Sequence, residues 1–581
     1  MIKILRYFKW YYWLICLAIV GLIYCQVQLE LKLPDYMEDI VGHIMSFGST
    51  KDILGVGLKM LGVSLLATIL MIIVGYLSAN IAARFAKILR NKIFCKVESF
   101  SMTEMNRFST ASLITRSTND VTQVQNVVMM TLRIAVTAPI MAGTAITKIL
   151  NRSEDLTKSI AISVLCLVVF IVSLMIIVMP KFKKFQTKVD KLNSVTRENL
   201  TGLRVVRAYN AEEYQEEKFD KANTDIAKTE LFINRTMGLM HPFMHLVFDS
   251  IGLIVWWLGA HLISKGLVDL AVVSAFTGYA MQIVTSFMMI TMIFIMIPRG
   301  IVSAKRINEI LDTENIINDP LNPVQSKGEV KGEIEFKNVS FKYPGADEYV
   351  IEDVTFKAKK GEMVAFIGST GSGKSTLINL IPRFYDATEG EILVDGINVK
   401  NYTQYDLHEK LGYVPQKGLL FSGTIRSNMQ IGKDDASDEE IARALDIAQA
   451  TDFVNKLEEK YDYPIAQGGT NVSGGQKQRL CIARAIIKNP EIFIFDDSFS
   501  ALDYKTDKAL RKRLEKETKD ATVLVVAQRI GTIMNADKII VLDEGRMVGM
   551  GTHEELLESC DVYREMALSQ LSKEELAYGK N

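Results

Sequence analysis

Residues 363–376 read MVAFIGSTGSGKST, and a helical pattern follows them. An apolar run that leads into G-x-x-x-x-G-K-[ST] and then into a helix is the strand–loop–helix context of a phosphate-binding loop. The glycines let backbone N–H groups turn inward around phosphates, and the helix N-terminus adds positive potential. Lys374 would place a cation on the β and γ oxygens, and Ser375 would ligate Mg²⁺. The loop indicates a bound nucleoside triphosphate, but it does not by itself identify a reaction.

A second apolar run, residues 492–495, ends in Asp496 and Asp497. A buried strand that ends in a carboxylate is the Walker B arrangement, in which Asp496 would hold Mg²⁺. Between the two motifs lies Ser473-Gly474-Gly475-Gln476, followed by a helical pattern. A serine and two glycines at the start of a helix can bind an anion, but the same residues are equally typical of an ordinary helix cap.

The N-terminal half of the chain contains long segments that favour a membrane. Four windows are free of charged residues: 10–29, 60–83, 159–180 and 270–298. Two further segments, 121–147 and 236–264, are each interrupted by one charged residue, Arg133 and Asp249 respectively. Because a membrane-spanning helix needs roughly 20 apolar residues, we predict six spans. For the Arg133 segment, a buried soluble helix is the alternative. No small-x-small cleavage site follows the first window, so we expect a retained span rather than a signal peptide.

Lysine and arginine gather in two of the connections between these spans, which predicts the orientation of the chain. The connection between spans two and three carries Arg84, Lys87, Arg90, Lys92, Lys96, Arg107 and Arg116, and that between spans four and five carries Lys181, Lys183, Lys184, Lys188, Lys191, Arg197, Arg204 and Arg207. Both connections, both termini and the C-terminal half should therefore be cytoplasmic. Apolar residues recur at helical spacing in both connections, so we expect helical extensions of the spans.

The composition changes near residue 328, where short β-rich runs begin to alternate with helical patterns. This alternation predicts a multidomain chain: an all-α transmembrane domain over 1–311, a linker over 312–332, and an α/β nucleotide-binding domain over 333–581. The 67 basic and 67 acidic residues cancel, which argues against a nucleic-acid partner. Six cysteines without a C-x-x-C pair exclude a disulfide scaffold and a zinc ribbon.

Together these segments resemble the ATP-binding cassette (ABC) family. Gln416 resembles the Q-loop glutamine, the run Ser500 to Asp503 resembles the D-loop, and Tyr343 resembles the aromatic residue that stacks on adenine. The resemblance implies that ATP and Mg²⁺ bind, with Mg²⁺ at Ser375, Gln416 and Asp496. The residues implied to contact the nucleotide are Tyr343, Gly368, Ser369, Gly371, Ser372, Gly373, Lys374, Ser375 and Thr376, and in trans Ser473, Gly474, Gly475 and Gln476.

The membrane half resembles the exporter branch of that family, whose fold has six spans (type IV). The resemblance rests on three segments, residues 116–120, 198–209 and 303–312. The resemblance implies that two such chains dimerise, and that each ATP lies between the phosphate loop of one chain and the signature 473–476 of the other. Signature and phosphate loop lie about 100 residues apart, which argues against the DNA-repair and chromosome-structuring ATPases that share the signature.

Two positions depart from the family pattern. Asp497 stands where the pattern has the Glu that serves as general base, and its carboxylate ends about 1.5 Å short of that position. Gln528 stands where the pattern has the switch His, and an amide cannot carry a titratable proton. We therefore expect a degenerate ATP site in a heterodimer, in which Gln416 and Asp503 accompany these two residues. A homodimer that tolerates Asp497 is the alternative.

Clues to the cargo are fewer. The sixth span carries Met281, Met288, Met289, Met292 and Met296, which suit an apolar cavity or, more simply, helix packing. His241, His245 and Asp249 share one helix face and could line a hydrated cavity, join helices by hydrogen bonds or, less simply, bind a metal. We predict ATP-driven export of an amphipathic or hydrophobic small molecule across the plasma membrane. A homodimeric lipid or peptide exporter and an ATP-gated membrane regulator are the alternatives.

Overall fold

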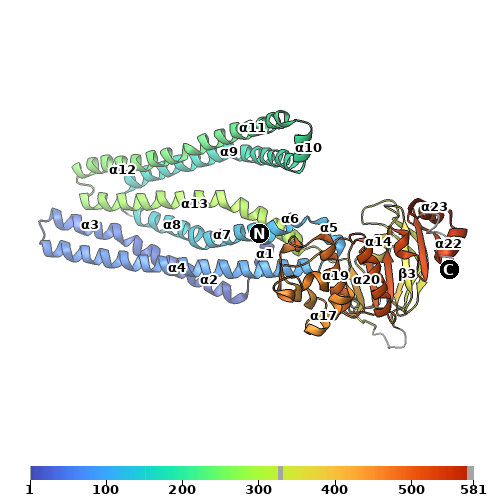
Figure 1. Cartoon of the computed structure of the whole chain (residues 1–581). Coiled ribbons are helices and arrows are strands. Elements are labelled where there is room, and N and C mark those ends of the chain that lie inside the picture. Colours follow the sequence, from blue (N-terminus) through green and yellow to red (C-terminus); the bar gives the residue numbers. More distant parts are fainter. Residues whose placement is uncertain (1, 151, 325–330, 572–581) are drawn as a thin grey trace. The chain divides into compact units, whose positions relative to one another are not determined.

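The structure is a computed structural model that describes residues 2–150, 152–324 and 331–571 (Figure 1). It divides into two compact units. The first contains residues up to 98 together with 110–313, and the second contains 99–109 together with the residues from 314 onward. Residues 325–330 of the predicted linker lie outside the described part.

The first unit is entirely helical. In its described residues, six helical stretches are long and apolar enough to cross a membrane: Trp10–Met45, Thr50–Glu98, Thr110–Leu150, Glu154–Thr201, Glu212–Ser264 and Leu270–Leu311. The prediction of six spans is confirmed. The elements are α1 (Ile2–Leu5), α2 (Trp10–Glu30), α3 (Lys32–Met45), α4 (Thr50–Glu98), α6 (Thr110–Thr115), α7 (Val121–Met130), α8 (Val136–Leu150), α9 (Glu154–Thr201), α10 (Leu203–Ala208), α11 (Glu212–Gly238), α12 (Met240–Ser264) and α13 (Leu270–Leu311).

The helices extend far beyond the uncharged windows. Helix α4 has 49 residues and α9 has 48, so each is about 70 Å long at 1.5 Å per residue. The basic connections are therefore helical, as predicted. Arg133 lies in the π-helical turn Thr131–Ala135, which interrupts an otherwise α-helical run between α7 and α8. A π-turn of this kind inserts one extra residue into a helix without ending it.

A charged network ties α3, α8 and α13 together at one end of the first unit. Asp35 of α3 accepts hydrogen bonds from Lys148 Nζ at 2.9 Å and from an Arg152 guanidinium nitrogen at 2.7 Å. The hydroxyl of Tyr279, a fully buried residue of α13, also donates to Asp35. Arg152 pairs in addition with Glu38. The carboxylates that follow the first span are thus neutralised by cations from the third, which offsets the cost of their partial burial.

The second unit contains two main sheets and several helices. The strands are β1 (Ile334–Phe341), β2 (Ile351–Ala358), β3 (Met363–Gly368), β4 (Glu389–Val394), β5 (Ile397–Asn398), β6 (Leu411–Val414), β7 (Gly423–Thr424), β8 (Pro464–Ile465), β9 (Ile492–Asp496), β10 (Thr522–Val526), β11 (Lys538–Asp543) and β12 (Arg546–Gly551). The helices are α5 (Met102–Arg107), α14 (Lys374–Asn379), α15 (Gln404–Glu409), α16 (Ile425–Gln430), α17 (Asp438–Ile447), α18 (Thr451–Val454), α19 (Gly474–Ile487), α20 (Tyr504–Glu517), α21 (Ile530–Ile533), α22 (His553–Ser559) and α23 (Asp561–Gln570).

The larger sheet positions the functional loops. Its strand order is β12-β11-β3-β10-β9-β6, and β3, β10, β9, β6 and β11 run parallel. The carboxyl ends of parallel strands meet at one edge of a sheet, where ligands bind in α/β folds. The phosphate loop follows β3, the Gln528 loop follows β10, Asp496 and Asp497 follow at the end of β9, and Gln416 follows β6. Four of the predicted motifs therefore lie at the carboxyl ends of four adjacent strands, on the same edge of the sheet.

The short helix α5 belongs to the second unit although its sequence lies between two spans. Ser101 and Glu104 form a capping box at its start. The nearly buried Glu104 carboxylate also accepts a hydrogen bond from the backbone N–H of Ile316 at 3.0 Å, and Asn106 donates to the hydroxyl of Tyr385 at 2.9 Å. Specific polar contacts therefore hold this segment of a basic connection against the α/β fold.

Candidate nucleotide site

The phosphate loop folds back over its own lysine. The ammonium of Lys374 donates hydrogen bonds to the carbonyl oxygens of Gly368 at 2.9 Å and Ser369 at 2.7 Å, and to Ser372 Oγ at 3.2 Å. Burial lowers the pKa of this lysine. The cation is thus held at the loop by weak, exchangeable acceptors, and phosphate oxygens are stronger acceptors for it.

At Gly373 the phosphate loop leaves no room for a side chain. Gly373 has φ +90°, and a Cβ there would lie 2.5 Å from Ile351 Cδ1 and 2.8 Å from the carbonyl oxygen of Val350. Only glycine adopts this conformation without strain. The turn places the next residue, Lys374, at the start of α14, so that backbone N–H groups and the helix N-terminus face the same space. This geometry suits a polyphosphate, and the binding of one by these residues stays a prediction.

Two of the three predicted magnesium ligands are adjacent. Ser375 Oγ donates to Asp496 Oδ1 at 2.7 Å, and Asp496 is nearly buried at the end of β9. Burial raises the pKa of this carboxyl. A hydroxyl and a carboxylate are ligands that Mg²⁺ takes, and both sit next to the phosphate loop. Gln416, predicted as a third ligand, lies instead within hydrogen-bond distance of Asp497.

The two unusual residues bond directly to each other. Gln528 Nε2 donates to Asp497 Oδ2 at 2.8 Å, and Gln416 Nε2 approaches the same oxygen at 3.3 Å. The Asp497 backbone is in the left-handed region with φ +44°, and its N–H donates to the Val526 carbonyl oxygen at 3.0 Å. Oδ2 of Asp497 is therefore within hydrogen-bond distance of two amide donors. A carboxylate in this arrangement joins the loops after β6, β9 and β10.

Tyr343 lies beside the phosphate loop. Its hydroxyl hydrogen-bonds with Thr376 Oγ1 at 3.0 Å, and its ring makes edge contacts with Phe341 and Tyr385. The aromatic residue predicted to stack on adenine and the last residue of the phosphate loop are thus in contact.

The signature residues lie at the start of helix α19, as expected both for an anion-binding site and for an ordinary helix cap. Ser473 caps the helix, and Gln476 closes the capping box. A Cβ on Gly475 would lie 3.3 Å from the carbonyl oxygen of Ala501, so the signature and the D-loop are neighbours within this chain. Asp503 caps α20 by accepting a hydrogen bond from the Thr506 N–H at 3.1 Å. The signature and the D-loop therefore form one local cluster at the starts of α19 and α20.

One contact to the site could not be inferred from any motif. Gln570, the last residue of α23, donates from Nε2 to the carbonyl oxygen of Gln528 at 3.0 Å, and its Oε1 accepts from the Ile530 N–H at 2.9 Å. A lone glutamine 42 positions after Gln528 carries no sequence signal for this role.

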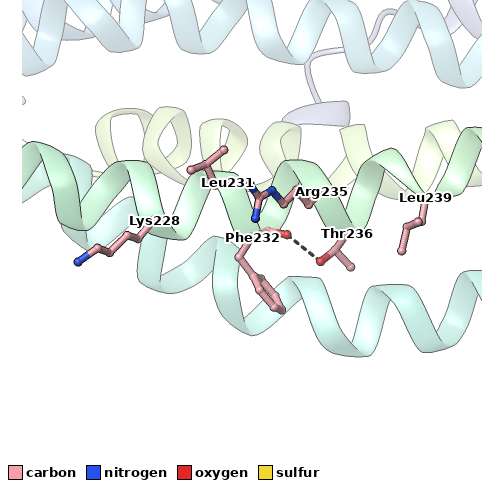
Figure 2. Close-up of a pocket in the computed structure, with 6 residues that line it drawn as sticks. All are labelled: Lys228, Leu231, Phe232, Arg235, Thr236 and Leu239. Carbon is pink, nitrogen blue, oxygen red and sulfur yellow. Dashed lines mark hydrogen bonds between the residues drawn. The ribbon is translucent and has the colours of Figure 1, made fainter.

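In the helical unit, one face of α11 forms a groove of about 600 Å³ (Figure 2). Its lining combines two cations with apolar side chains: Lys228, Leu231, Phe232, Arg235, Thr236 and Leu239. Thr236 Oγ1 donates to the Phe232 carbonyl oxygen at 2.7 Å, and Lys181 of α9 lies 5.0 Å from the centre of the Phe232 ring. On α12, His245 and Asp249 are not buried, and the side chain of His241 lies outside the described residues. Among the described residues, no group of three His, Cys, Asp or Glu could hold a metal.

Comparisons with known proteins define the class of protein. Residues 10–288 match the family described as the ABC transporter transmembrane region, and residues 351–500 match the family described as ABC transporter. An uncharacterized ABC transporter ATP-binding protein of Mycobacterium tuberculosis is 40% identical over 544 residues, which cover 93% of each chain. An uncharacterized ABC transporter ATP-binding protein of Bacillus subtilis, YfiB, is 34% identical over 572 residues, covering 98% of this chain and 99% of YfiB. The chain belongs to the ABC transporter family.

Two further similarities add detail. A putative multidrug export ATP-binding/permease protein of Staphylococcus aureus is 35% identical over 371 residues, or 64% of each chain. The solved structure of a bacterial Atm1-family ABC exporter with ATP bound superposes with a TM-score of 0.81 at 24% identity, covering 96% of this chain and 98% of that one. This likeness shows that the chain has the ABC exporter fold, as predicted.

We expect Lys374→Ala to weaken binding of ATP to the purified chain by about 10- to 100-fold, because a charge-assisted hydrogen bond is worth about 1.5–3 kcal/mol. Equilibrium binding of a fluorescent ATP analogue measures the change. Lys512→Ala, which removes an exposed lysine of α20, is the matched control. Equal affinity of the two variants would contradict the assignment of the phosphate loop.

Proposed function

We propose that this chain is one subunit of a heterodimeric ABC exporter and that its own ATP site retains nucleotide but hydrolyses it slowly. The observation that carries the proposal is the engagement of Asp497 Oδ2 by the side-chain amides of Gln528 and Gln416. A general base must be within hydrogen-bond reach of the proton that it abstracts. Here Oδ2 of the shortened carboxylate already accepts two amide hydrogens, and the amide of Gln528 carries no titratable proton.

The intact residues give this site and its partner site different roles. Lys374 and the backbone of its loop would hold the β and γ phosphates, and Ser375 and Asp496 would hold Mg²⁺, which neutralises charge between those phosphates when it is bound. The signature of this chain, 473–476, would face the phosphate loop of the partner. In this proposal the competent site combines the partner's catalytic residues with Ser473, Gly474, Gly475 and Gln476 of this chain.

ATP binding would bring the two nucleotide-binding domains together, and hydrolysis at the competent site would release them. The states with and without γ-phosphate then favour opposite conformations of one equilibrium. The short helices α5 and α10, which interrupt the two basic connections, would transmit this closure to the spans. The positive charge of those connections favours a cytoplasmic location for them, for both termini and for the nucleotide-binding domain, with the spans in the plasma membrane.

We propose an amphipathic or hydrophobic small molecule as cargo. The α11 groove offers apolar side chains between two cations, Lys228 and Arg235 (Figure 2). In the sixth span, Met288 and Met292 are exposed in the described unit, and their flexible thioethers can adapt to differently shaped apolar ligands. The name of the Staphylococcus aureus relative, a putative multidrug exporter, agrees with such a cargo.

The experiment that tests the proposal compares ATPase activity in lipid vesicles of the chain purified alone and of the chain co-purified with its partner half-transporter. We expect turnover by the pair to exceed that of the single chain by at least about 100-fold, the effect of misplacing a catalytic group by about 1 Å. Robust turnover by the chain alone that Asp497→Asn abolishes would establish a competent homodimer instead. Accumulation of a fluorescent amphipathic anion against its gradient, only with ATP, distinguishes a pump from an ATP-gated channel.

A further inference from the structure

The loop that carries Gln528 is held from outside the catalytic motifs. It follows β10 and covers Ala527, Gln528 and Arg529 before α21 begins at Ile530. On one side, the side chain of Gln528 donates to Asp497. On the other side, the Gln570 amide accepts from the Ile530 N–H at 2.9 Å and donates to the Gln528 carbonyl oxygen at 3.0 Å. The loop is thus fixed between the Walker B carboxylate and the C-terminal helix.

The two hydrogen bonds need an amide in one orientation. Oε1 faces a donor and Nε2 faces an acceptor, so a flipped side chain would lose both bonds. A glutamate could keep the bond from Ile530 but could not donate to Gln528. A serine, threonine or alanine would be too short to bridge both backbone groups. The two hydrogen bonds together therefore require the side-chain amide of a glutamine at position 570.

The helix that presents Gln570 is anchored in the core. Tyr563 and Ala567 of α23 are fully buried. The Tyr563 hydroxyl lies 2.6 Å from Nδ1 of His553, which is itself buried in α22. Gln570 follows Tyr563 by seven residues, about two helical turns, and so projects from the same side of the helix. A movement of the Gln528 loop away from Asp497 must break the Gln570 contacts or move an anchored helix.

We propose that Gln570 is a positioning residue that clamps the Gln528 loop and thereby slows the release of ATP retained at this chain's site. The inference rests on the proposed function, since it requires that the site holds ATP. Gln570 acts through the backbone of the loop and does not itself contact the nucleotide. Gln570 prolongs the contact between the loops after β9 and β10. It does not affect the initial contact of the phosphates with Lys374.

The test uses the full heterodimer in lipid vesicles, loaded with radiolabelled ATP and then chased with unlabelled ATP. We expect Gln570→Ala to accelerate release of the retained label by about tenfold, and Gln570→Glu to accelerate it by a smaller factor because one of the two hydrogen bonds survives. Ser569→Ala is the matched control, because the Ser569 hydroxyl bonds only to Met566 within α23 in the described contacts. We expect Ser569→Ala to release label at the wild-type rate.

Two further measurements separate positioning from mere stability. The thermal unfolding temperature should match between Gln570→Ala and Ser569→Ala, whereas the ATP affinity of Gln570→Ala should fall by no more than the rise in its release rate. An unchanged release rate in Gln570→Ala, or faster release accompanied by a lower unfolding temperature, would overturn the inference. A wild-type pair that retains no label would overturn the proposed function itself, and a wild-type pair that retains label while Gln570→Ala matches it would overturn only the role of Gln570.

Discussion

We expect the double substitution Asp497→Glu with Gln528→His to raise ATP turnover by the chain purified alone by about 100-fold or more, because positioned proton transfer contributes about 10²–10⁴ in rate. The added methylene would extend the carboxylate by about 1.5 Å toward the nucleotide. The histidine would restore a titratable group at the end of β10. In a homodimer each altered site would face an intact signature of the second copy, so no partner chain is needed. Phosphate release in lipid vesicles measures the gain.

The single substitutions are the controls, and we expect each of them to raise ATP turnover only a few-fold. With Asp497→Glu alone, the longer carboxylate would still meet the donating amide of Gln528. With Gln528→His alone, the new imidazole would still face the short carboxylate of Asp497. Residues in direct contact commonly show non-additive effects, so the double variant should exceed the product of the singles. Wild-type turnover that already equals that of the double variant would show that Asp497 and Gln528 form a competent site.

The local motifs could be predicted because short stretches of chain determine them. The phosphate loop needs a strand, a glycine-rich turn and a helix start, and all three lie within residues 363–379. The strand that ends in Asp496 and the helix that begins at Gly474 follow from equally local patterns of apolar and capping residues. The convergence of four such motifs follows from the parallel strand order, which was not predicted from the sequence.

The side-chain contacts around Asp497 and Gln528 could not be predicted in this way. The Gln528–Asp497 hydrogen bond joins side chains 31 residues apart, and the Gln570 contact reaches across 42. Each depends on where a loop after one strand meets a loop or helix from another, which composition and periodicity do not specify. The same holds in the membrane half, where Asp35 finds Lys148 and Arg152 more than 110 residues away.

The uncharged windows located the spans but underestimated the lengths of the helices. Residues 60–83 predicted one span, whereas α4 runs from Thr50 to Glu98. Hydropathy reports only the part of a helix that suits lipid, and a helix continues in water wherever its residues favour it and tertiary packing supports it. At the first span the window 10–29 nearly coincides with α2, which ends at Glu30, and α3 starts at Lys32 within one long helical stretch. Here the uncharged window missed only the continuation into α3.

In the heterodimer we expect Gly475→Asp in this chain to reduce ATP-driven transport by about 1,000-fold, whereas Lys374→Ala reduces it by less than about fivefold. Gly475 lies in the first turn of α19, where a bound phosphate would meet the helix N-terminus. A carboxylate there would repel the phosphates of the partner's nucleotide by about 4 kcal/mol at 4 Å and an effective dielectric constant of 20. Under the proposed function, Lys374 serves only the slow site. Uptake of the fluorescent amphipathic anion into inside-out vesicles measures both variants.

The unequal loss of transport in Gly475→Asp and Lys374→Ala distinguishes a heterodimer from a homodimer. Measurements of stability separate this effect from damage to the fold. An aspartate in the first turn of a helix favours the helix through its dipole, so Gly475→Asp should leave the unfolding temperature within a few degrees of wild type. Gly475→Ala is the matched variant without charge: its Cβ would lie 3.3 Å from the Ala501 carbonyl oxygen, a contact that a small shift relieves. We expect it to retain most transport. If Lys374→Ala and Gly475→Asp were equally harmful, both sites of the transporter would depend on this chain's phosphate loop, and the two sites would be equivalent copies of one another.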